Sequence, residues 1–130
     1  MVKRYFPVMH VIVAGFILTG CQSIEISRWS GSWVDERSSD HGGDLRCVSR
    51  RLDETNWQAT FSGFCGREFG YDIEMHGRQD GSAVKFDGEV DLGEEDGGVY
   101  TWTGVMQGNH FNGEYATRTG KAGSFVMVRY

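Results

Sequence analysis

The alternation of apolar and polar residues with a period of two is the feature that most constrains the fold of this chain. From Gly31 onward there is no proline, and no window repeats apolar residues at the spacing of three to four that marks a helix. The clearest case runs from Phe69 to His76, where aromatic and aliphatic residues occupy every second position up to Met75. Such a pattern is typical of antiparallel strands with one buried and one polar face.

Eight segments of this kind are separated by short stretches rich in glycine, asparagine and aspartate, which favour turns. The expected strands are residues 31–36, 45–52, 57–65, 69–76, 84–92, 100–106, 111–115 and 125–127. Connections this short predict a meander, and eight strands in a meander can close into a barrel, which leaves no exposed sheet edge. We therefore predict an all-β, eight-stranded antiparallel up-and-down barrel over residues 31–130, with a sandwich of the same strands as the alternative.

A weak repeat supports closure: an aromatic residue, one further residue, and then a glycine on the same face of the strand. It begins at Phe61, Phe86, Trp102 and Phe111. Inward glycines let strands bend around a narrow barrel, and the neighbouring aromatic ring can cover the bare backbone.

Residues 1–20 have the three-part pattern of an export signal. Lys3 and Arg4 form a basic start, an apolar run follows to Leu18, and small residues precede Cys21. A membrane-spanning helix is the rival interpretation, but only 16 residues lie between Arg4 and Cys21, whereas a span needs about 20. We expect a signal peptide.

The segment Leu18-Thr19-Gly20-Cys21 resembles the cleavage box of bacterial lipoproteins. The resemblance implies cleavage before Cys21, a diacylglycerol thioether on its sulfur, and usually a third acyl chain on its new amino group. Two or three acyl chains hold a protein stably on a membrane. Because Gln22 stands where inner-membrane lipoproteins carry Asp, the resemblance implies the periplasmic face of the outer membrane. Residues 21–30 would then be the lipidated anchor and a short linker.

With Cys21 assigned to lipid, Cys47 and Cys65 remain as a pair. In an oxidising compartment we expect a disulfide between them, closing a loop of 18 residues and stabilising the fold by about 3 kcal/mol. A tight turn at residues 53–56 pairs Cys47 with about Ser62, so the bridge requires a β-bulge near Gly63.

The expected mature chain is acidic. Removing residues 1–20 leaves 11 basic residues against 18 acidic ones, a formal charge of −7. Nucleic acid and anionic lipid headgroups are therefore unsuitable partners for its surface, whereas a basic protein is suitable.

The two ends of the expected barrel, Gly31-Ser32-Trp33 and Arg129, resemble the signature of lipocalins and the wider calycin group. In that group a Gly-x-Trp opens the first strand, and a basic residue near the end of the last strand packs across the Trp. The resemblance implies a small lipocalin-like barrel in which Trp33 and Arg129 make the closure, through a cation–π contact of about 0.5–2 kcal/mol.

The inward-facing positions of the expected strands are unusually aromatic. Small barrels of eight strands either fill their interior with side chains or hold one small ligand. Both alternatives stay open here, and a pocket, if present, is expected to be shallow, apolar and near one mouth. The candidate ligand-lining residues are Trp57, Phe61, Tyr71, Phe86, Tyr100, Trp102 and Tyr115.

No catalytic or metal-binding pattern emerges. The acidic segment from Asp91 to Gly98 does not fit the ligand spacing of a calcium-binding EF-hand, and His41, His76 and His110 lack the spacing of a metal site. Consecutive residues such as Ser38 to His41 cannot converge as a catalytic triad. We expect no enzyme activity, metal or cofactor.

Two functions fit these expectations. The first is a lipocalin-like lipoprotein that binds a small apolar or aromatic ligand, or another envelope component. The alternative is a protein-interaction barrel with a filled core, for example an inhibitor of a cell-wall hydrolase, or a structural envelope lipoprotein. Since many lysozymes are basic, an acidic surface would steer the barrel towards them.

The anchor makes a direct prediction. Cys21→Ser removes the acylated sulfur, so the protein should leave the membrane fraction and appear in the soluble fraction when cells are fractionated. Retention of the variant in membranes would show that the cleavage-box interpretation is wrong.

Overall fold

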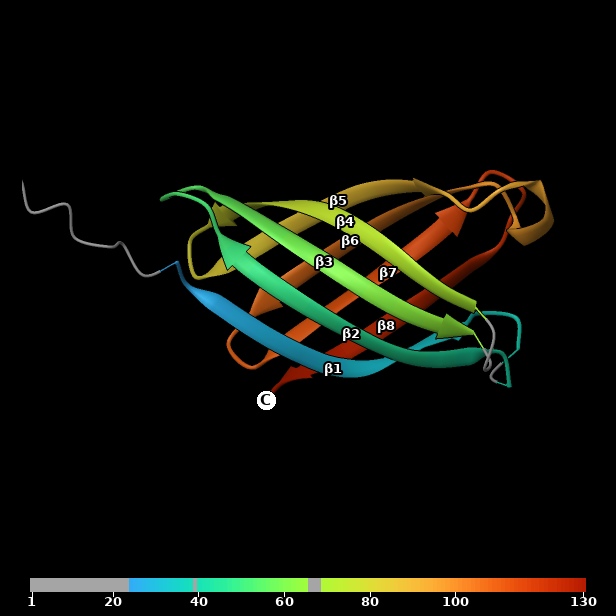
Figure 1. The fold of residues 1–130 in the computed structure, drawn as a ribbon, viewed down its shortest axis with the longest axis horizontal. Coiled ribbons are helices and arrows are strands. Elements are labelled where there is room, and N and C mark those ends of the chain that lie inside the picture. The colour runs from blue at the N-terminus through green and yellow to red at the C-terminus, as the bar shows by residue number, and fades with distance from the viewer. Residues whose placement is uncertain (1–23, 39, 66–68) are drawn as a thin grey trace, which may run out of the picture.

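The computed structural model describes residues 24–38, 40–65 and 69–130, which form a closed barrel of eight antiparallel strands in sequence order (Figure 1). The strands are β1 (Ile26–Asp35), β2 (Gly42–Arg51), β3 (Asn56–Cys65), β4 (Phe69–Asp80), β5 (Ala83–Asp91), β6 (Val99–Gln107), β7 (His110–Thr117) and β8 (Ala122–Arg129). One short 3₁₀ helix, η1 (Glu94–Asp96), interrupts the β5–β6 connection. The predicted all-β class, the meander and the closure into a barrel are confirmed. Within the described ranges there is no helix of the length and apolarity needed to cross a membrane.

The first strand begins earlier than the sequence indicated. β1 starts at Ile26 rather than Gly31, so residues 26–30 are part of the barrel wall and not a linker. The alternation misleads here because the apolar Ile26 faces outward and is 50% exposed, whereas Ser27 faces inward and is buried. Trp29, which follows in the inward register, is completely buried.

The closure between β1 and β8 uses a different tryptophan from the one expected. Trp29 pairs with Arg129 across the two strands, and the guanidinium carbon of Arg129 lies 4.8 Å from the centre of the Trp29 ring. Trp33 pairs instead with Phe125, and its Nε1 donates a hydrogen bond to the carbonyl oxygen of Phe64 at 3.1 Å. The predicted contact of Arg129 with Trp33 is therefore wrong, because β1 starts five residues earlier and brings Trp29 to the end of β8.

The predicted disulfide between Cys47 and Cys65 is also wrong. Cys47 is a buried free cysteine, and its backbone partner on β3 is Phe61. The register between β2 and β3 runs without a bulge, so Cys65 lies four residues beyond Phe61, about 13 Å along the strand. A disulfide requires Cα atoms within about 7 Å. The bulge that the bridge needed does not form.

The lumen is filled mainly by aromatic and sulfur-containing side chains at the predicted inward positions. Those confirmed as buried are Trp57, Phe61, Met75, Phe86, Trp102, Met106, Phe111, Tyr115, Phe125 and Met127. Paired glycines let these rings reach the barrel wall: a Cβ at Gly113 would lie 2.5 Å from the Phe125 ring, and one at Gly104 would lie 2.9 Å from the Phe111 ring. The rings thus occupy the space that a side chain at either glycine would need.

The two ends of the barrel differ. At one end lie Ile26, the C-terminus and the tight turns that join β2 to β3, β4 to β5 and β6 to β7 (Figure 1). Two of these turns have only two residues between the paired strands, and each begins with a glycine of positive φ, Gly81 at 61° and Gly108 at 59°. Glycine adopts this conformation without strain, as such hairpin loops require.

Two tryptophans fill the lumen at this end, which we call the sealed end. The Nε1 of Trp29 donates to the Oγ of Ser49 at 3.0 Å, and the Nε1 of Trp57 donates to the Oε1 of Gln79 at 2.9 Å. Arg51 lies over the Trp57 ring at 5.8 Å, as Arg129 lies over Trp29. The opposite end, which we call the open end, carries the β1–β2, β3–β4, β5–β6 and β7–β8 connections.

The hydrogen bond between Trp29 and Ser49 predicts a stability change. Both residues are completely buried, so Ser49→Ala leaves an indole N–H without its acceptor and should lower the free energy of unfolding by about 1–3 kcal/mol. Urea unfolding measures this change. Ser62→Ala is the matched control, because the Ser62 hydroxyl bonds Asp72 on the exposed outer wall and its loss should change stability by less than about 0.5 kcal/mol. Equal effects of the two substitutions would contradict the assignment.

The β2–β3 turn predicts a pH dependence. The carboxylate of Asp53 accepts hydrogen bonds from the Asn56 side chain and from the backbone N–H groups of Thr55 and Asn56, which lower its pKa to about 2. Because this folded-state pKa lies below the ordinary value of 3.8, the stabilisation is present above pH 3.8 and is lost as the pH falls towards 2. Asp53→Asn, which cannot titrate, should flatten the stability profile in this window.

The control for this experiment is Glu54→Gln, which removes an adjacent carboxylate that takes part in none of the hydrogen bonds described for the turn. Urea unfolding at a series of pH values between 2 and 5 should show the flattening with Asp53→Asn only. An unchanged slope in the Asp53 variant would contradict the role of this carboxylate.

Candidate ligand-binding site

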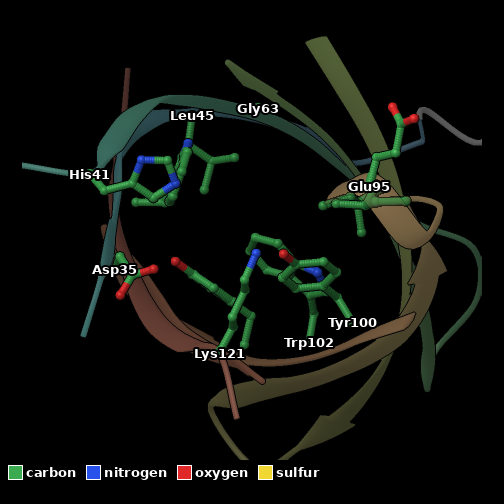
Figure 2. A pocket seen from close by; sticks show the side chains of 12 residues that line it. Asp35, His41, Leu45, Gly63, Glu95, Tyr100, Trp102 and Lys121 are labelled. Carbon is green, nitrogen blue, oxygen red and sulfur yellow. The ribbon is translucent and has the colours of Figure 1, made fainter. Parts of the chain in front are cut away.

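A pocket of about 240 Å³ opens at the open end of the barrel (Figure 2). We call it the mouth pocket. Its lining residues come from the β1–β2, β5–β6 and β7–β8 connections and from strands of the barrel wall. They are Trp33, Asp35, His41, Leu45, Gly63, Ile73, Leu92, Glu95, Tyr100, Trp102, Tyr115 and Lys121.

One side of the mouth pocket is aromatic. Trp102 on β6 and Tyr115 on β7 are directly paired across the two strands, and their rings stack with centroids 4.8 Å apart at an interplanar angle of 29°. Tyr100 and Trp33 flank Tyr115, with centroids at 6.0 and 6.1 Å. Tyr115 is also fixed from its polar end, because its hydroxyl donates to the carbonyl oxygen of Val34 at 3.2 Å. We call these four residues the aromatic wall.

The opposite side of the mouth pocket is aliphatic and has unused space at a glycine. Leu45, Gly63 and Ile73 lie there, and Figure 2 shows Leu45 and Gly63 across the opening from Tyr100 and Trp102. A Cβ added at Gly63 would meet only the Cδ1 of Leu45, at an ordinary contact distance of 3.6 Å. At Gly104 and Gly113 aromatic rings fill the corresponding space, so the pocket exists partly because no ring covers Gly63.

The rim of the mouth pocket is polar. Asp35 is held in place because its Oδ1 accepts a hydrogen bond from the backbone N–H of Arg37, and His41 packs edge-on against Trp33 at 5.4 Å. Lys121 extends its amine into the opening, whereas the carboxylate of Glu95 points away from its centre (Figure 2). The polar groups at the rim thus remain accessible to water, and the apolar surface lies deeper in the barrel.

The structure separates the residues predicted to line a ligand site. Tyr100, Trp102 and Tyr115 line the mouth pocket, as predicted. Phe61 and Phe86 instead pack on Phe111, with centroid distances of 5.3 and 4.9 Å, in the filled middle of the lumen. Trp57 lies at the sealed end, and the side chain of Tyr71 lies outside the part of the chain that the structure describes.

Sequence reasoning missed several lining residues, notably Trp33, Leu45 and Gly63. The Gly-x-Trp motif predicts a closure role for Trp33, but because β1 begins at Ile26, Trp29 meets Arg129 and Trp33 lines the pocket. The sequence does mark Gly63 as an inward-facing glycine, because Phe61-Ser62-Gly63 belongs to the aromatic-x-glycine repeat. Only the structure shows that its site, unlike those at Gly104 and Gly113, is left open.

The two alternatives for the lumen, an interior filled by side chains and a pocket, therefore each describe a different part of the barrel. Phe61, Phe86, Phe111 and Phe125 fill the middle, and Trp29 meets Phe111 edge-on at 5.6 Å from the sealed end. The space near the open end is not filled. The pocket is shallow and mainly apolar, and it lies near one mouth.

One polar atom of the aromatic wall is unusual. Trp102 is only 6% exposed, yet no residue in the described part of the chain accepts a hydrogen bond from its Nε1. The other three tryptophans all donate: Trp29 to Ser49, Trp33 to Phe64 and Trp57 to Gln79. A buried donor without an acceptor is rare and costly, so it calls for an explanation.

The described residues offer neither a cluster of metal ligands nor a reactive thiol. Among the described residues, no three His, Cys, Asp or Glu side chains converge closely enough to hold a metal ion. Cys47 is buried in apolar surroundings, and this burial raises the pKa of its thiol far above the ordinary value. The thiol is thus kept in its unreactive form. Cys21 lies outside the described residues.

Comparison with known proteins leaves the family open. No protein-family model, curated protein or solved structure matches this chain. The closed meander of eight strands agrees with the barrel that the lipocalin resemblance implied, whereas the pairing of Trp33 with Arg129 does not occur. Any function must therefore be inferred from the mouth pocket and its surroundings.

Proposed function

We propose that this protein is a ligand-binding barrel that holds a small apolar or aromatic molecule in the mouth pocket, and that a lipid on Cys21 anchors it to the cell envelope. One observation carries the proposal: an apolar pocket with an aromatic wall stands at one end of a lumen that is otherwise filled. Concave apolar sites with a few polar groups at the rim are typical of small-molecule sites.

The size of the mouth pocket limits the ligand. Its volume of about 240 Å³ lies below the range of about 300–1,000 Å³ that drug-sized ligands occupy. A single ring or a fused pair of rings suits this space, whereas a full-length fatty acid does not. The filled middle of the barrel prevents a longer ligand from extending towards Trp29.

The course of the chain favours a pocket that faces away from the membrane. Only four residues separate Cys21 from Ile26, the first residue of β1, and Ile26 lies at the sealed end (Figure 1). A lipid on Cys21 would hold the sealed end near the bilayer and leave the mouth pocket open to the periplasm. Exposed apolar residues also occur at the chain ends and turn of this side: Ile24, Ile26, Leu52 and Tyr130.

A protein-interaction function is the second candidate, and the outer surface favours it. Strands β4 and β5 carry a run of exposed carboxylates on their outer face, namely Asp72, Glu74, Asp87, Glu89 and Asp91. Such a face would attract a basic protein and speed its association. Binding to a basic lysozyme that persists when the mouth pocket is blocked would favour this candidate.

The most direct test of the ligand hypothesis begins with the protein purified from the cells that make it. Extraction with organic solvent followed by mass spectrometry should release a small apolar molecule in a stoichiometric amount. A barrel that yields no such molecule, and whose tryptophan fluorescence is unaffected by apolar aromatic probes, would contradict the proposal.

Blocking the pocket gives a matched prediction. Gly63→Val places two methyl groups in the unfilled space beside Leu45, and valine suits a strand, so the variant should fold while its affinity for an apolar fluorescent probe falls at least about tenfold. Probe fluorescence measures the affinity. The control is Ser62→Val, which introduces the same valine side chain on the outer face of β3 and should bind as the native protein does. Unchanged affinity in the Gly63 variant would place the binding site elsewhere.

A further inference from the structure

The outer wall of the barrel carries its charges unevenly. Strands β4 and β5 hold the run of exposed carboxylates described above, whereas β2, β1 and β8 lie side by side on the opposite side of the closed barrel (Figure 1). Residues 26–32, 45–52 and 122–130, which belong to these three strands and their ends, contain no aspartate or glutamate. This side of an acidic protein is therefore locally basic or uncharged.

Apolar side chains are exposed together on this side. The strands are adjacent at the residue level, because Ile26 pairs with Arg50 across β1 and β2, and the backbone N–H of Tyr130 donates to the carbonyl oxygen of Arg28 at 3.2 Å. Exposed apolar patches mark contact sites for proteins or membranes. The large apolar residues of this wall, each 50–69% exposed, are Ile24, Ile26, Leu52, Val126, Val128 and Tyr130.

Three arginines lie among these apolar residues. Arg28, Arg46 and Arg50 occupy the outward positions of β1 and β2, and all three are exposed. None of them forms an ion pair with a described residue, whereas the neighbouring Arg51 pairs with Glu25 at 3.8 Å. Their guanidinium groups can thus bind an anion outside the barrel, while their aliphatic stems lie along apolar surface. We call the three arginines and the six apolar residues the basic-apolar face.

We infer that the basic-apolar face docks on a phospholipid membrane that contains anionic headgroups, with its apolar side chains in the interface and its arginines on the lipid phosphates. This inference goes beyond the mouth pocket, and it rests on the proposed function for the anchor that brings the face near a membrane. Binding of this kind gains from both the buried apolar area and the attraction to anionic lipid.

The net negative charge of the chain does not oppose this docking. A charge beyond about 8–10 Å from a surface is largely screened at physiological ionic strength, so the membrane responds to the arginines that it meets and not to the carboxylates of the far wall. Cys21 precedes Ile24 by only three positions, so a lipid on Cys21 would enter the bilayer beside this face. The acidic strands β4 and β5 would then face the periplasm.

Paramagnetic broadening in nanodiscs tests the inference with the full chain, ¹⁵N-labelled and purified from the cells that make it. One set of nanodiscs contains phosphatidylcholine and phosphatidylglycerol, the other phosphatidylcholine alone, and both contain a trace of lipid with a spin-labelled headgroup. The backbone N–H resonances of Ile26, Arg50 and Val128 should broaden strongly in the acidic nanodiscs and much less in the neutral ones. Those of Glu74 and Asp87, on the far wall, should stay sharp in both.

A double substitution tests the arginines. Arg28→Gln with Arg50→Gln should lower the ratio of docked to undocked protein by about tenfold or more, because each arginine near an anionic surface contributes about fivefold. Both side chains are exposed, so the variant should fold, and its NMR spectrum verifies this. The matched control is Arg37→Gln with Arg118→Gln, which removes two exposed charges at the open end and should leave the broadening unchanged.

The outcomes separate this inference from the proposed anchor. Equal broadening of the basic-apolar face in both nanodiscs, or no change in the Arg28 and Arg50 variant, would overturn the inference while the anchor stands. Retention of the chain by the acidic nanodiscs alone, lost in that variant, would support the inference and overturn the anchor. Retention by neither would overturn both. If the resonances of the face respond to protein concentration rather than to lipid, a second copy of the chain occupies it and the inference is wrong.

Discussion

The packing of aromatic rings along the barrel axis is the constraint on which the rest of this structure depends. Eight strands enclose a narrow lumen, and inward glycines such as Gly113 allow rings as large as Phe125 to reach across it. At the sealed end the rings are also pinned by polar contacts, because Trp29 donates to Ser49 and lies under the guanidinium of Arg129. This end therefore has fixed geometry, and it sets the register in which β1 meets β8.

The asymmetry between the two ends gives the barrel a recessed apolar site at its open end. Connections of two to four residues and two tryptophans close the sealed end, whereas the open end carries the β1–β2 and β5–β6 connections of six and seven residues. The absence of a ring over Gly63 leaves space opposite the stacked surface of Trp102 and Tyr115. Binding at the mouth pocket would thus use surface that the core packing already holds rigid, which lowers the entropic cost of association.

Much of this fold could be predicted from the sequence, because a period of two and turn residues at regular spacing report directly on strands and their connections. The errors concern long-range register. Because the apolar Ile26 faces solvent, the alternation of apolar and polar residues does not reveal that β1 starts there. The Gly-x-Trp motif therefore points to Trp33 as the partner of Arg129, whereas Trp29 is the tryptophan that contacts Arg129. The expected disulfide is wrong for the same reason: the two cysteines that remain once Cys21 is assigned to lipid suggest a pair, but the β2–β3 register places Cys47 opposite Phe61. The pocket itself depends on which glycine lacks a covering ring, and no local pattern reveals that.

The central claim is that ligands enter only the open end of a lumen that is filled elsewhere. The four tryptophans divide evenly between the two ends, so their indole N–H resonances in ¹⁵N-labelled full-length protein report on each end separately. Addition of an apolar ring compound such as indane should shift the resonances of Trp33 and Trp102 and leave those of Trp29 and Trp57 unchanged. Shifts at Trp29 or Trp57, or no shift at any of the four, would contradict this account.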